Sequence, residues 1–266
     1  MTGLSPRLAR MAARVGGLRG FHYTIHIAED PAFVFFSNPI CACSTLKATL
    51  NMSVARRQGR DDFRIASAEA IHDRRANLLK TPQDIGHDRF EAMLDDPGVT
   101  KFAFVRRAES RFLSAFRKKL SHETAFTRRV RAYLGVDAQV PLAGFLTPDR
   151  FAAGVAADPG LRDLDEHWRL QRSQIFFDDV PDLQIGFVED FAADAARILG
   201  AIFGPDGVVM QDAVEINPAN TSASRAELAL SDAGRADVAR AYAADLGMLA
   251  TCHLRRKVLA ALQDKT

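Results

Sequence analysis

Residues 35–50 read FFSNPICACSTLKATL, and this stretch decides the fold. An apolar run stops at Ser-Asn-Pro, small residues and two cysteines follow, and a helical pattern then begins. The transition predicts a strand, a tight turn and a helix whose N-cap is Ser44 or Thr45, because their hydroxyls can accept a hydrogen bond from the first helical turn. Backbone amides at the start of such a helix also favour a bound anion.

Three apolar runs of this kind predict buried strands. They occupy residues 32–37, 101–105 and 183–188, and each is followed at once by a helical pattern, at residues 45–57, 108–120 and 191–203. Strands that alternate with helices form a parallel sheet covered by helices on its faces. The predicted fold class is therefore α/β: a parallel sheet flanked by helices, with a mainly helical insertion and a C-terminal helix.

The segments between and after these strands predict further helices and a long loop. Residues 67–94 have a helical pattern with a break near Thr81-Pro82, since proline interrupts a helix. Residues 204–224 are rich in Gly, Pro, Asn and Ser and predict a loop of the length that often serves as a lid or binding element. Ser231 is expected to cap a final helix that runs toward Gln263.

The chain has 266 residues, a formal net charge of +2 and three cysteines. A net charge so close to zero argues against a general nucleic-acid binder. Three cysteines, two of them one residue apart, cannot close a disulfide framework, which predicts reduced thiols. No apolar stretch approaches the roughly 20 residues that span a bilayer. We therefore expect no transmembrane segment and a cytoplasmic protein, and the Ala- and Arg-rich, Lys-poor composition is compatible with a bacterial one.

The first residues differ in charge from the rest of the chain. Residues 1–28 contain four arginines and no acidic residue. We interpret residues 1–30 as a basic N-terminal helical segment with a solvated charged face, and an Arg-rich organellar transit peptide is the alternative. Residues 31–266 are then expected to form a single α/β domain.

The loop at residues 38–47 is not a Walker A motif, because it contains no glycine. Its composition therefore argues against a nucleoside triphosphatase. Small residues such as Ala42 and Ser44 nevertheless allow the backbone to approach an anion closely, and the hydroxyls of Ser44 and Thr45 add hydrogen-bond donors.

A second basic motif follows the second predicted strand. Arg106 stands at the end of that strand, and Arg111, Ser114 and Lys118 fall on one face of the next helix by their three- and four-residue spacing. Arginine suits phosphate because its planar guanidinium can make two charge-assisted hydrogen bonds. The alternative interpretation is a solvated basic face of the helix.

Both segments resemble motifs of one enzyme family. NPICACSTLK (38–47) resembles the 5′-phosphosulfate-binding loop of carbohydrate (family 2 type) sulfotransferases, and KFAFVRRAESRFLSAFRKKL (101–120) resembles their 3′-phosphate motif. DEHWRLQ (165–171) resembles the His-Trp segment of the family, and GFVEDFAADAARILG (186–200) resembles the strand and helix that follow it. The four segments occur in the order of the family, over roughly residues 33–250.

The resemblance implies a P-loop-like sheet and 3′-phosphoadenosine 5′-phosphosulfate (PAPS) as sulfuryl donor, with no metal. It implies that the loop holds the 5′-phosphosulfate, that a strand-end arginine and a helix serine hold the 3′-phosphate, and that NPANTSASR (217–225) closes over the nucleotide. The implied donor-binding residues are Cys41, Ala42, Cys43, Ser44, Thr45, Arg106, Ser114 and Arg225. The implied acceptor is a hydroxyl group of a glycan or another small molecule.

The sequence departs from the family pattern at two positions. Ile40 stands where the family loop has a lysine that meets the bridging oxygen of the leaving phosphate, and Ala108 stands where the second motif has proline. Loss of the loop lysine would cost on the order of 3–4 kcal/mol of transition-state stabilisation, by analogy with a lost oxyanion donor. Lys47 matches a second family lysine and is a candidate catalytic residue, with a surface helix lysine as the alternative.

Sulfuryl transfer also needs a base, because the acceptor hydroxyl loses its proton as it attacks sulfur. Histidine has a suitable pKa for this role. His72, between the two phosphate motifs, and His167, in the His-Trp segment, are the candidates. A purely structural role is the alternative for each.

Three other functions compete with this interpretation. A kinase-like phosphotransferase is disfavoured by the missing Walker lysine. A non-catalytic nucleotide-binding or interaction domain would be consistent with Ile40 in place of the loop lysine. Metal or redox chemistry at Cys41, Cys43 and Cys252 is disfavoured, because the one-residue spacing is wrong for a zinc knuckle.

Overall fold

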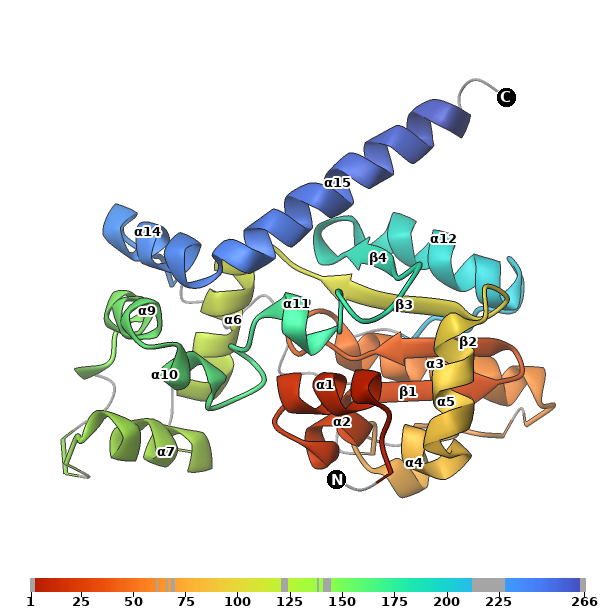
Figure 1. The fold of residues 1–266 in the computed structure, drawn as a ribbon, viewed down its shortest axis with the longest axis horizontal. Coiled ribbons are helices and arrows are strands. Elements are labelled where there is room, and N and C mark those ends of the chain that lie inside the picture. Colours follow the sequence, from red (N-terminus) through yellow and green to blue (C-terminus); the bar gives the residue numbers. More distant parts are fainter. Residues whose placement is uncertain are drawn as a thin grey trace. The chain divides into compact units, whose positions relative to one another are not determined.

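The structure, a computed structural model, describes residues 3–60, 62–65, 67, 70–120, 124–137, 139–140, 145–211 and 228–263. The chain falls into two compact units, whose helices and strands are labelled in Figure 1. Unit 1 comprises Met1–Val105 and Ser173–Arg225, and unit 2 comprises Arg106–Arg172 and Ala226–Thr266.

Unit 1 contains a four-stranded sheet in the order β1-β2-β3-β4. The strands are β1 (Ile25–Glu29), β2 (Ala32–Phe36), β3 (Thr100–Val105) and β4 (Gln184–Phe187). β2, β3 and β4 are parallel, and each begins and ends within one residue of a predicted strand. The three predicted strands and their parallel pairing are therefore confirmed.

The first strand departs from the prediction. β1 pairs with β2 in the antiparallel sense, with Ile25 opposite Phe36. Only Asp30 and Pro31 connect the two strands, and so short a connection permits a hairpin but not the crossover that parallel strands need. The sheet was predicted to be parallel throughout, and that prediction is wrong at this edge. Residues 25–29 form a strand rather than part of the expected N-terminal helical segment.

The helices of unit 1 lie on both faces of the sheet (Figure 1). They are α1 (Pro6–Arg14), α2 (Leu18–Thr24), α3 (Cys43–Arg57), α4 (Pro82–Ile85), α5 (His87–Asp95) and α12 (Phe191–Phe203), with 3₁₀ turns at Arg74–Ala76 and Val188–Asp190. α3 and α12 cover one face, where they pack against Phe35 and Phe102. Because side chains alternate along a strand, Phe36 points to the other face. There it contacts Phe176, which in turn contacts Phe21 of α2.

The helices of unit 1 only partly follow the sequence pattern. α12 has its predicted bounds, whereas α3 begins two residues earlier than predicted. Residues 67–80 were expected to be helical, but the described ones form turns and the 3₁₀ turn at Arg74–Ala76. The predicted break is present, because Thr81 caps α4 just before Pro82. Of the predicted loop, residues 204–211 contain no helix or strand, and the remainder lies outside the described residues.

The basic N-terminal segment packs one face of α1 into unit 1. Leu8 and Met11 are fully buried. On the polar side, Nε of Arg14 lies 2.8 Å from a carboxylate oxygen of Asp179. The segment thus has an apolar buried face and an ion-paired arginine, which differs from a fully solvated helix.

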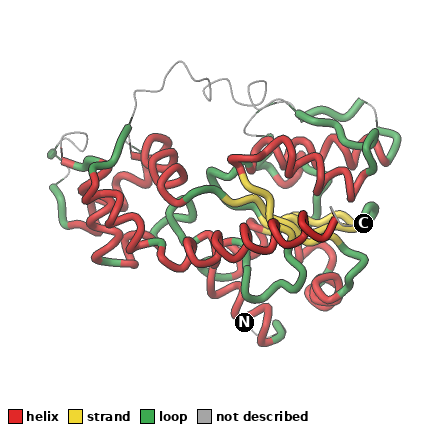
Figure 2. Tube along the Cα trace, turned by 90° about the horizontal axis from the view of Figure 1, so that it is seen from above, coloured by secondary structure: helices red, strands yellow, loops and turns green. Residues whose placement is uncertain are grey.

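Unit 2 consists of helices and loops in its described parts, and Figure 2 shows the strands in unit 1. Its helices are α6 (Ala108–Leu120), α7 (Ala125–Leu134), α9 (Pro148–Ala157), α10 (Pro159–Asp163), α14 (Asp232–Ala241) and α15 (Ala243–Gln263), and α11 (Gln171–Gln174) crosses the boundary of the units. α6 has its predicted bounds. The single predicted C-terminal helix is two helices that separate at Tyr242, whose buried ring contacts Phe112 of α6. Among the described residues, no helix combines the length and apolar composition needed to cross a membrane.

Candidate functional site

The loop between β2 and α3 has a strained backbone. Ile40 and Ala42 have φ angles of 67° and 56°, in the left-handed region that residues with a Cβ avoid. Each such residue costs about 1–2 kcal/mol, and strained residues of this kind cluster at ligand sites. The loop is fixed to the sheet by Asn38, whose Nδ2 donates to the carbonyl oxygen of Phe104 in β3 at 3.0 Å.

The N-terminus of α3 has no side-chain cap. Ala42 is the N-cap residue, and its methyl group cannot accept a hydrogen bond. The prediction of Ser44 or Thr45 as the cap is wrong, because α3 begins at Cys43 and both residues lie inside its first turn. Cys43, Ser44 and Thr45 are all partly exposed, so an anion could take the place of the missing cap at their amides.

These groups fit the 5′-phosphosulfate end of the implied donor. The first-turn amides and the hydroxyls of Ser44 and Thr45 are hydrogen-bond donors, and the dipole of α3 adds positive potential at the same point. Cys41 differs from its neighbours, because its side chain is buried and its amide already donates to the Asn38 carbonyl oxygen at 3.1 Å. The predicted loop thus offers its donors from Ala42 onward.

Lys47 lies in the second turn of α3 and is buried, with 1% of its surface exposed. The alternative interpretation of a surface lysine is therefore wrong. Helical side chains tilt toward the helix N-terminus, and the four residues between Cys43 and Lys47 span about 6 Å of helix axis. The stem of Lys47 therefore runs back toward the loop. Its Nζ lies 5.0 Å from the ring centroid of Tyr23.

Tyr23 also contacts the predicted base. Its hydroxyl oxygen lies 3.2 Å from Nδ1 of His72. His72 is exposed and lies in a turn, whereas the sequence pattern predicted a helix there. Unit 1 thus brings two predicted catalytic residues, Lys47 and His72, to opposite parts of one tyrosine side chain.

Arg74 also contacts this tyrosine, and His26 in turn contacts Arg74. Arg74 donates from Nη2 to the carbonyl oxygens of His22, Tyr23 and Ile25, at 2.9, 2.6 and 3.2 Å, where α2 ends. Its Nη1 lies 2.8 Å from Nδ1 of His26. Because a guanidinium can only donate, Nδ1 of His26 accepts and the ring carries its proton on Nε2. That buried Nε2 has no hydrogen-bond partner in the structure.

The basic residues impose a positive potential on one another. Burial, followed by the charges of Lys47 and Arg74, holds the pKa of His26 well below its usual range. Burial likewise lowers the pKa of Arg74 to about 10. Lys47 and Arg74 thus place positive charge beside α3, and the carboxylate of Asp84 acts on Arg74 in the opposite sense.

We expect the free energy of unfolding to fall as the pH is lowered from 7 to 5. His26 stays neutral in the folded protein, while the unfolded chain binds a proton below about pH 6.5, so acidification favours the unfolded state by up to about 1.4 kcal/mol per pH unit. The pKa values of His22 and His167 are also lowered, chiefly by burial, so these two residues likewise make the folded protein less stable as the pH falls.

Urea unfolding at several pH values measures this dependence. A His26→Asn variant keeps an acceptor for Arg74. Its unfolding should take up about one proton fewer than that of the wild type, so its free energy of unfolding should depend less steeply on pH, whatever its stability at pH 7. His253→Asn, at an exposed position of α15, is the matched histidine-to-asparagine control. An unchanged slope in His26→Asn would mean that His26 is protonated in the folded state.

The second predicted phosphate motif lies at the start of unit 2. Arg106 directly follows β3, and its backbone is held by Gln171, whose Oε1 accepts from the Arg106 amide at 3.0 Å and whose Nε2 donates to the Arg106 carbonyl oxygen at 2.8 Å. The side chains of Arg106 and Ser114 are partly exposed and can reach a ligand. Gln171 thus links this motif to the end of the predicted His-Trp segment.

Arg111 does not share the environment of the other residues on its helix face. It is 2% exposed and donates from Nη1 to the Arg169 carbonyl oxygen at 2.9 Å and from Nη2 to that of Glu166 at 3.0 Å. Lys118 on the same face is exposed. The alternative of a solvated basic face is therefore wrong for Arg111, which anchors the segment around His167 from inside unit 2.

His167 is paired with a carboxylate that the sequence analysis did not single out. Nδ1 of His167 lies 2.6 Å from Oδ1 of Asp165, and the same oxygen accepts from the His167 amide at 2.9 Å. Because an ionised carboxylate only accepts, Nδ1 carries the proton and Nε2 is left with a lone pair. The spacing Asp-x-His is the signal that could have identified this pair.

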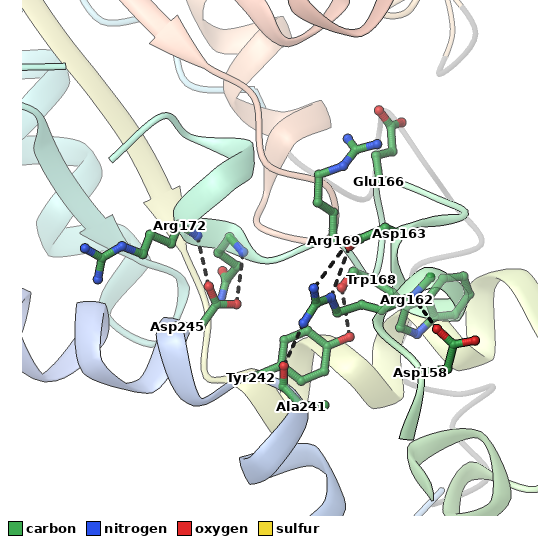
Figure 3. A network of polar contacts seen from close by, with 12 residues as sticks. Asp158, Arg162, Asp163, Glu166, Trp168, Arg169, Arg172, Ala241, Tyr242 and Asp245 are labelled. Carbon is green, nitrogen blue, oxygen red and sulfur yellow. Dashed lines mark hydrogen bonds and ion pairs between the residues drawn. The ribbon is translucent and has the colours of Figure 1, made fainter. Parts of the chain in front are cut away.

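Further hydrogen bonds of unit 2 also hold this segment (Figure 3). The Tyr242 hydroxyl donates to the carbonyl oxygen of Trp168 at 2.9 Å, and Asp245 accepts from the amides of Gln171 and Arg172, both at 2.9 Å. Burial raises the pKa of Asp245, although both amide hydrogen bonds oppose this shift. The network fixes the backbone on both sides of Arg169.

A surface pocket of about 630 Å³ lies near the C-terminal end of α3. It is lined by Met52, Ala55, Arg56, Arg60, Arg64, Val209 and Gln211. Arg56 stands 14 residues after Ala42, which corresponds to about 20 Å along the helix. Arginine in the last turn also compensates the negative end of the helix dipole. This pocket is therefore separate from the loop and has a structural explanation for its charge.

Two other predictions concern Arg225 and the three cysteines. Arg225 lies outside the described residues. The three cysteines are free thiols, and Cys41 and Cys252 are buried. Over the described part of the chain, no three His, Cys, Asp or Glu side chains gather in a way that could hold a metal ion.

Fold and loop together define an α/β protein in which a strand passes through a strained loop into a helix with no side-chain cap. The sequence matches the model of the sulfotransferase family over residues 23–248. This match covers most of the chain, so the chain belongs to the sulfotransferase family, and the predicted resemblance is confirmed at that level. Comparison with curated proteins and with solved structures gave no significant match.

Proposed function

We propose that this protein transfers a sulfuryl group from PAPS to a hydroxyl group of a carbohydrate acceptor. Membership of the sulfotransferase family supports sulfuryl transfer in general. The observation that carries the proposal is the uncapped N-terminus of α3 with the buried Lys47 behind it. The carbohydrate acceptor rests on the resemblance of the two phosphate motifs to those of carbohydrate sulfotransferases.

In this proposal the donor is held at two phosphate groups. The amides of Cys43, Ser44 and Thr45 and the two hydroxyls bind the 5′-phosphosulfate. Arg106 and Ser114 bind the 3′-phosphate, for which the guanidinium provides charge-assisted hydrogen bonds. Arg225 is proposed as a further phosphate contact on the strength of the sequence motif alone.

Sulfuryl transfer requires that donor and acceptor are positioned, that a base accepts the acceptor proton and that positive charge stabilises the leaving phosphate. The acceptor oxygen forms a bond to sulfur while the bond between sulfur and the bridging phosphate oxygen breaks, so the products are a sulfate ester and 3′,5′-bisphosphoadenosine. His72 takes the proton of the acceptor hydroxyl at Nε2, because Nδ1 faces Tyr23. Lys47 offsets the negative charge that develops on the leaving phosphate, the role that Ile40 cannot supply.

Ligand-dependent thermal unfolding tests donor binding. We expect 3′,5′-bisphosphoadenosine at about a hundredfold over its dissociation constant to stabilise the protein by about 2.7 kcal/mol. ATP with magnesium is expected to stabilise it less, because ATP has no 3′-phosphate for Arg106. Arg106→Ala should weaken the bisphosphate effect, and Arg107→Ala, at the exposed neighbouring position, is the control.

The outcome separates the proposed function from its two competitors. Stabilisation by ATP but not by the bisphosphate would favour a kinase-like phosphotransferase. Bisphosphate binding without transfer from labelled PAPS to a panel of glycans and simple alcohols would favour a non-catalytic domain. Transfer to simple alcohols but to no glycan would overturn the carbohydrate acceptor.

A further inference from the structure

Tyr23 contacts both proposed catalytic residues of unit 1. Its ring faces Nζ of Lys47 at 5.0 Å and the guanidinium carbon of Arg74 at 6.0 Å, and its hydroxyl oxygen is 3.2 Å from Nδ1 of His72. Its own backbone is fixed, because its carbonyl oxygen accepts from Arg74 at 2.6 Å. No sequence motif pointed to this residue.

We propose that Tyr23 is a positioning residue: its hydroxyl oxygen accepts the Nδ1 proton of His72, which leaves the lone pair of Nε2 for the acceptor hydroxyl, while its ring holds the ammonium group of Lys47. The catalytic roles of His72 and Lys47 rest on the proposed function. The position of the proton on His72 is independent of that function.

The choice of nitrogen follows from the chemistry of imidazole. A neutral histidine has one nitrogen with a proton and one with a lone pair, and the partner of one nitrogen decides the state of the other. With Tyr23 as the acceptor at Nδ1, that nitrogen keeps its proton and proton transfer falls to Nε2. A phenol oxygen has lone pairs to accept the Nδ1 proton both before and after His72 gains its second proton, so the contact persists through the reaction.

A neutral phenol suits this place better than a carboxylate. In unit 2, His167 is oriented by the ionised Asp165. A carboxylate beside His72 would pair with Lys47 and Arg74 and cancel positive charge that an anionic donor needs. Tyr23 orients the imidazole without adding charge, and its ring face attracts the ammonium group of Lys47 through the cation–π interaction.

Two substitutions separate the hydroxyl from the ring. Tyr23→Phe removes the hydroxyl and keeps the face that Lys47 contacts, whereas Tyr23→Leu removes both. Tyr133→Phe is the matched control, because Tyr133 is an exposed phenol of unit 2 outside the proposed site. Thermal unfolding of each variant reports whether it folds.

The first readout is the tautomer of His72, observed by ¹⁵N NMR of histidine-labelled protein without any ligand. The His72 signals are assigned by their loss in His72→Gln. We expect the Nδ1–H form in the wild type and in Tyr133→Phe, and a shift toward the Nε2–H form in Tyr23→Phe. An Nε2–H form in the wild type, or no change in Tyr23→Phe, would overturn the inference.

The second readout is kinetic. Tyr23→Phe should lower kcat for sulfuryl transfer about 10- to 100-fold, the range seen when a partner that orients a histidine is lost, with the affinity for 3′,5′-bisphosphoadenosine unchanged. Tyr23→Leu should lower that affinity as well. Equal losses of affinity in both variants would assign the effect to general disruption. A wild type with the expected tautomer but no transfer would contradict the proposed function and leave the role of Tyr23 in place.

Discussion

A Lys47→Met variant is expected to transfer sulfuryl groups about 10²–10³-fold more slowly than the wild type, the cost of losing one preorganised charge-stabilising group. The reaction places negative charge on the bridging oxygen of the leaving phosphate. An ammonium group in a buried position acts on that charge with little screening by water. Lys47 is buried and lies behind a loop in which Ile40 has replaced the family lysine. Initial rates at saturating donor and acceptor measure the effect.

The chain offers a matched control for this substitution. Lys101 of β3 is also buried in unit 1, and its Nζ donates to the carbonyl oxygen of Asp96 at 2.9 Å, away from the loop. Lys101→Met therefore reports the general cost of losing a buried lysine. If Lys101→Met and Lys47→Met lower the rate equally, Lys47 has no special role in the reaction.

A second variant tests whether Lys47 has taken over the role of the missing loop lysine. Adding Ile40→Lys to Lys47→Met restores an ammonium group at the loop position that the family uses. We expect the double variant to transfer sulfuryl groups at least tenfold faster than Lys47→Met alone. Lysine also lacks the branched Cβ that strains Ile40 at its positive φ. Failure to recover activity in a folded double variant would show that the two positions are not equivalent.

A His72→Gln variant is expected to lower kcat about 10²–10⁴-fold, the usual contribution of a positioned general base. His72 is exposed, so its replacement should change the free energy of unfolding by no more than about 0.5 kcal/mol. Its Nδ1 faces Tyr23, and the same tyrosine contacts Lys47. The proposed base and the proposed charge-stabilising lysine thus contact one side chain.

His167→Gln provides the contrasting experiment. Nε2 of His167 has a lone pair, as proposed for Nε2 of His72, because Asp165 contacts Nδ1 of His167. It is nevertheless largely buried within the hydrogen-bonded segment that Arg111 and Tyr242 hold in unit 2. We therefore expect His167→Gln to lower the melting temperature and to leave kcat of the folded protein within tenfold of the wild type. The reverse pattern, with kcat lost only in His167→Gln, would assign the base to His167.

Much of the fold was predictable because its signals are local. Short apolar runs and the helical patterns after them gave β2, β3, β4, α6 and α12 nearly residue by residue. The candidate anion site at the start of α3 was proposed from small residues and hydroxyls at a strand–helix transition. β1 was missed because its pairing depends on a two-residue connection inside a segment whose arginines suggested a solvated helix.

The candidate site was less predictable because side-chain environment is not a local property. The same helical spacing would place Arg111 toward a phosphate or toward the interior, and only the packing of unit 2 directs it to backbone carbonyl groups. Lys47 could equally have been a surface residue. Tyr23 has no motif, and its contacts with Lys47 and His72 come from segments 24 and 49 residues away in the chain.

The sequence by itself thus determined the three parallel strands with the helices that follow them, the position of the loop between β2 and α3 and the family to which the chain belongs. Only the tertiary structure decided which basic residues are buried, which group faces Nδ1 of each candidate histidine and which side chain lies beside both Lys47 and His72. The physical reason is that hydrophobic periodicity and capping act between near neighbours in the sequence. Burial, charge and hydrogen-bond partners depend on groups that meet only after the chain has folded.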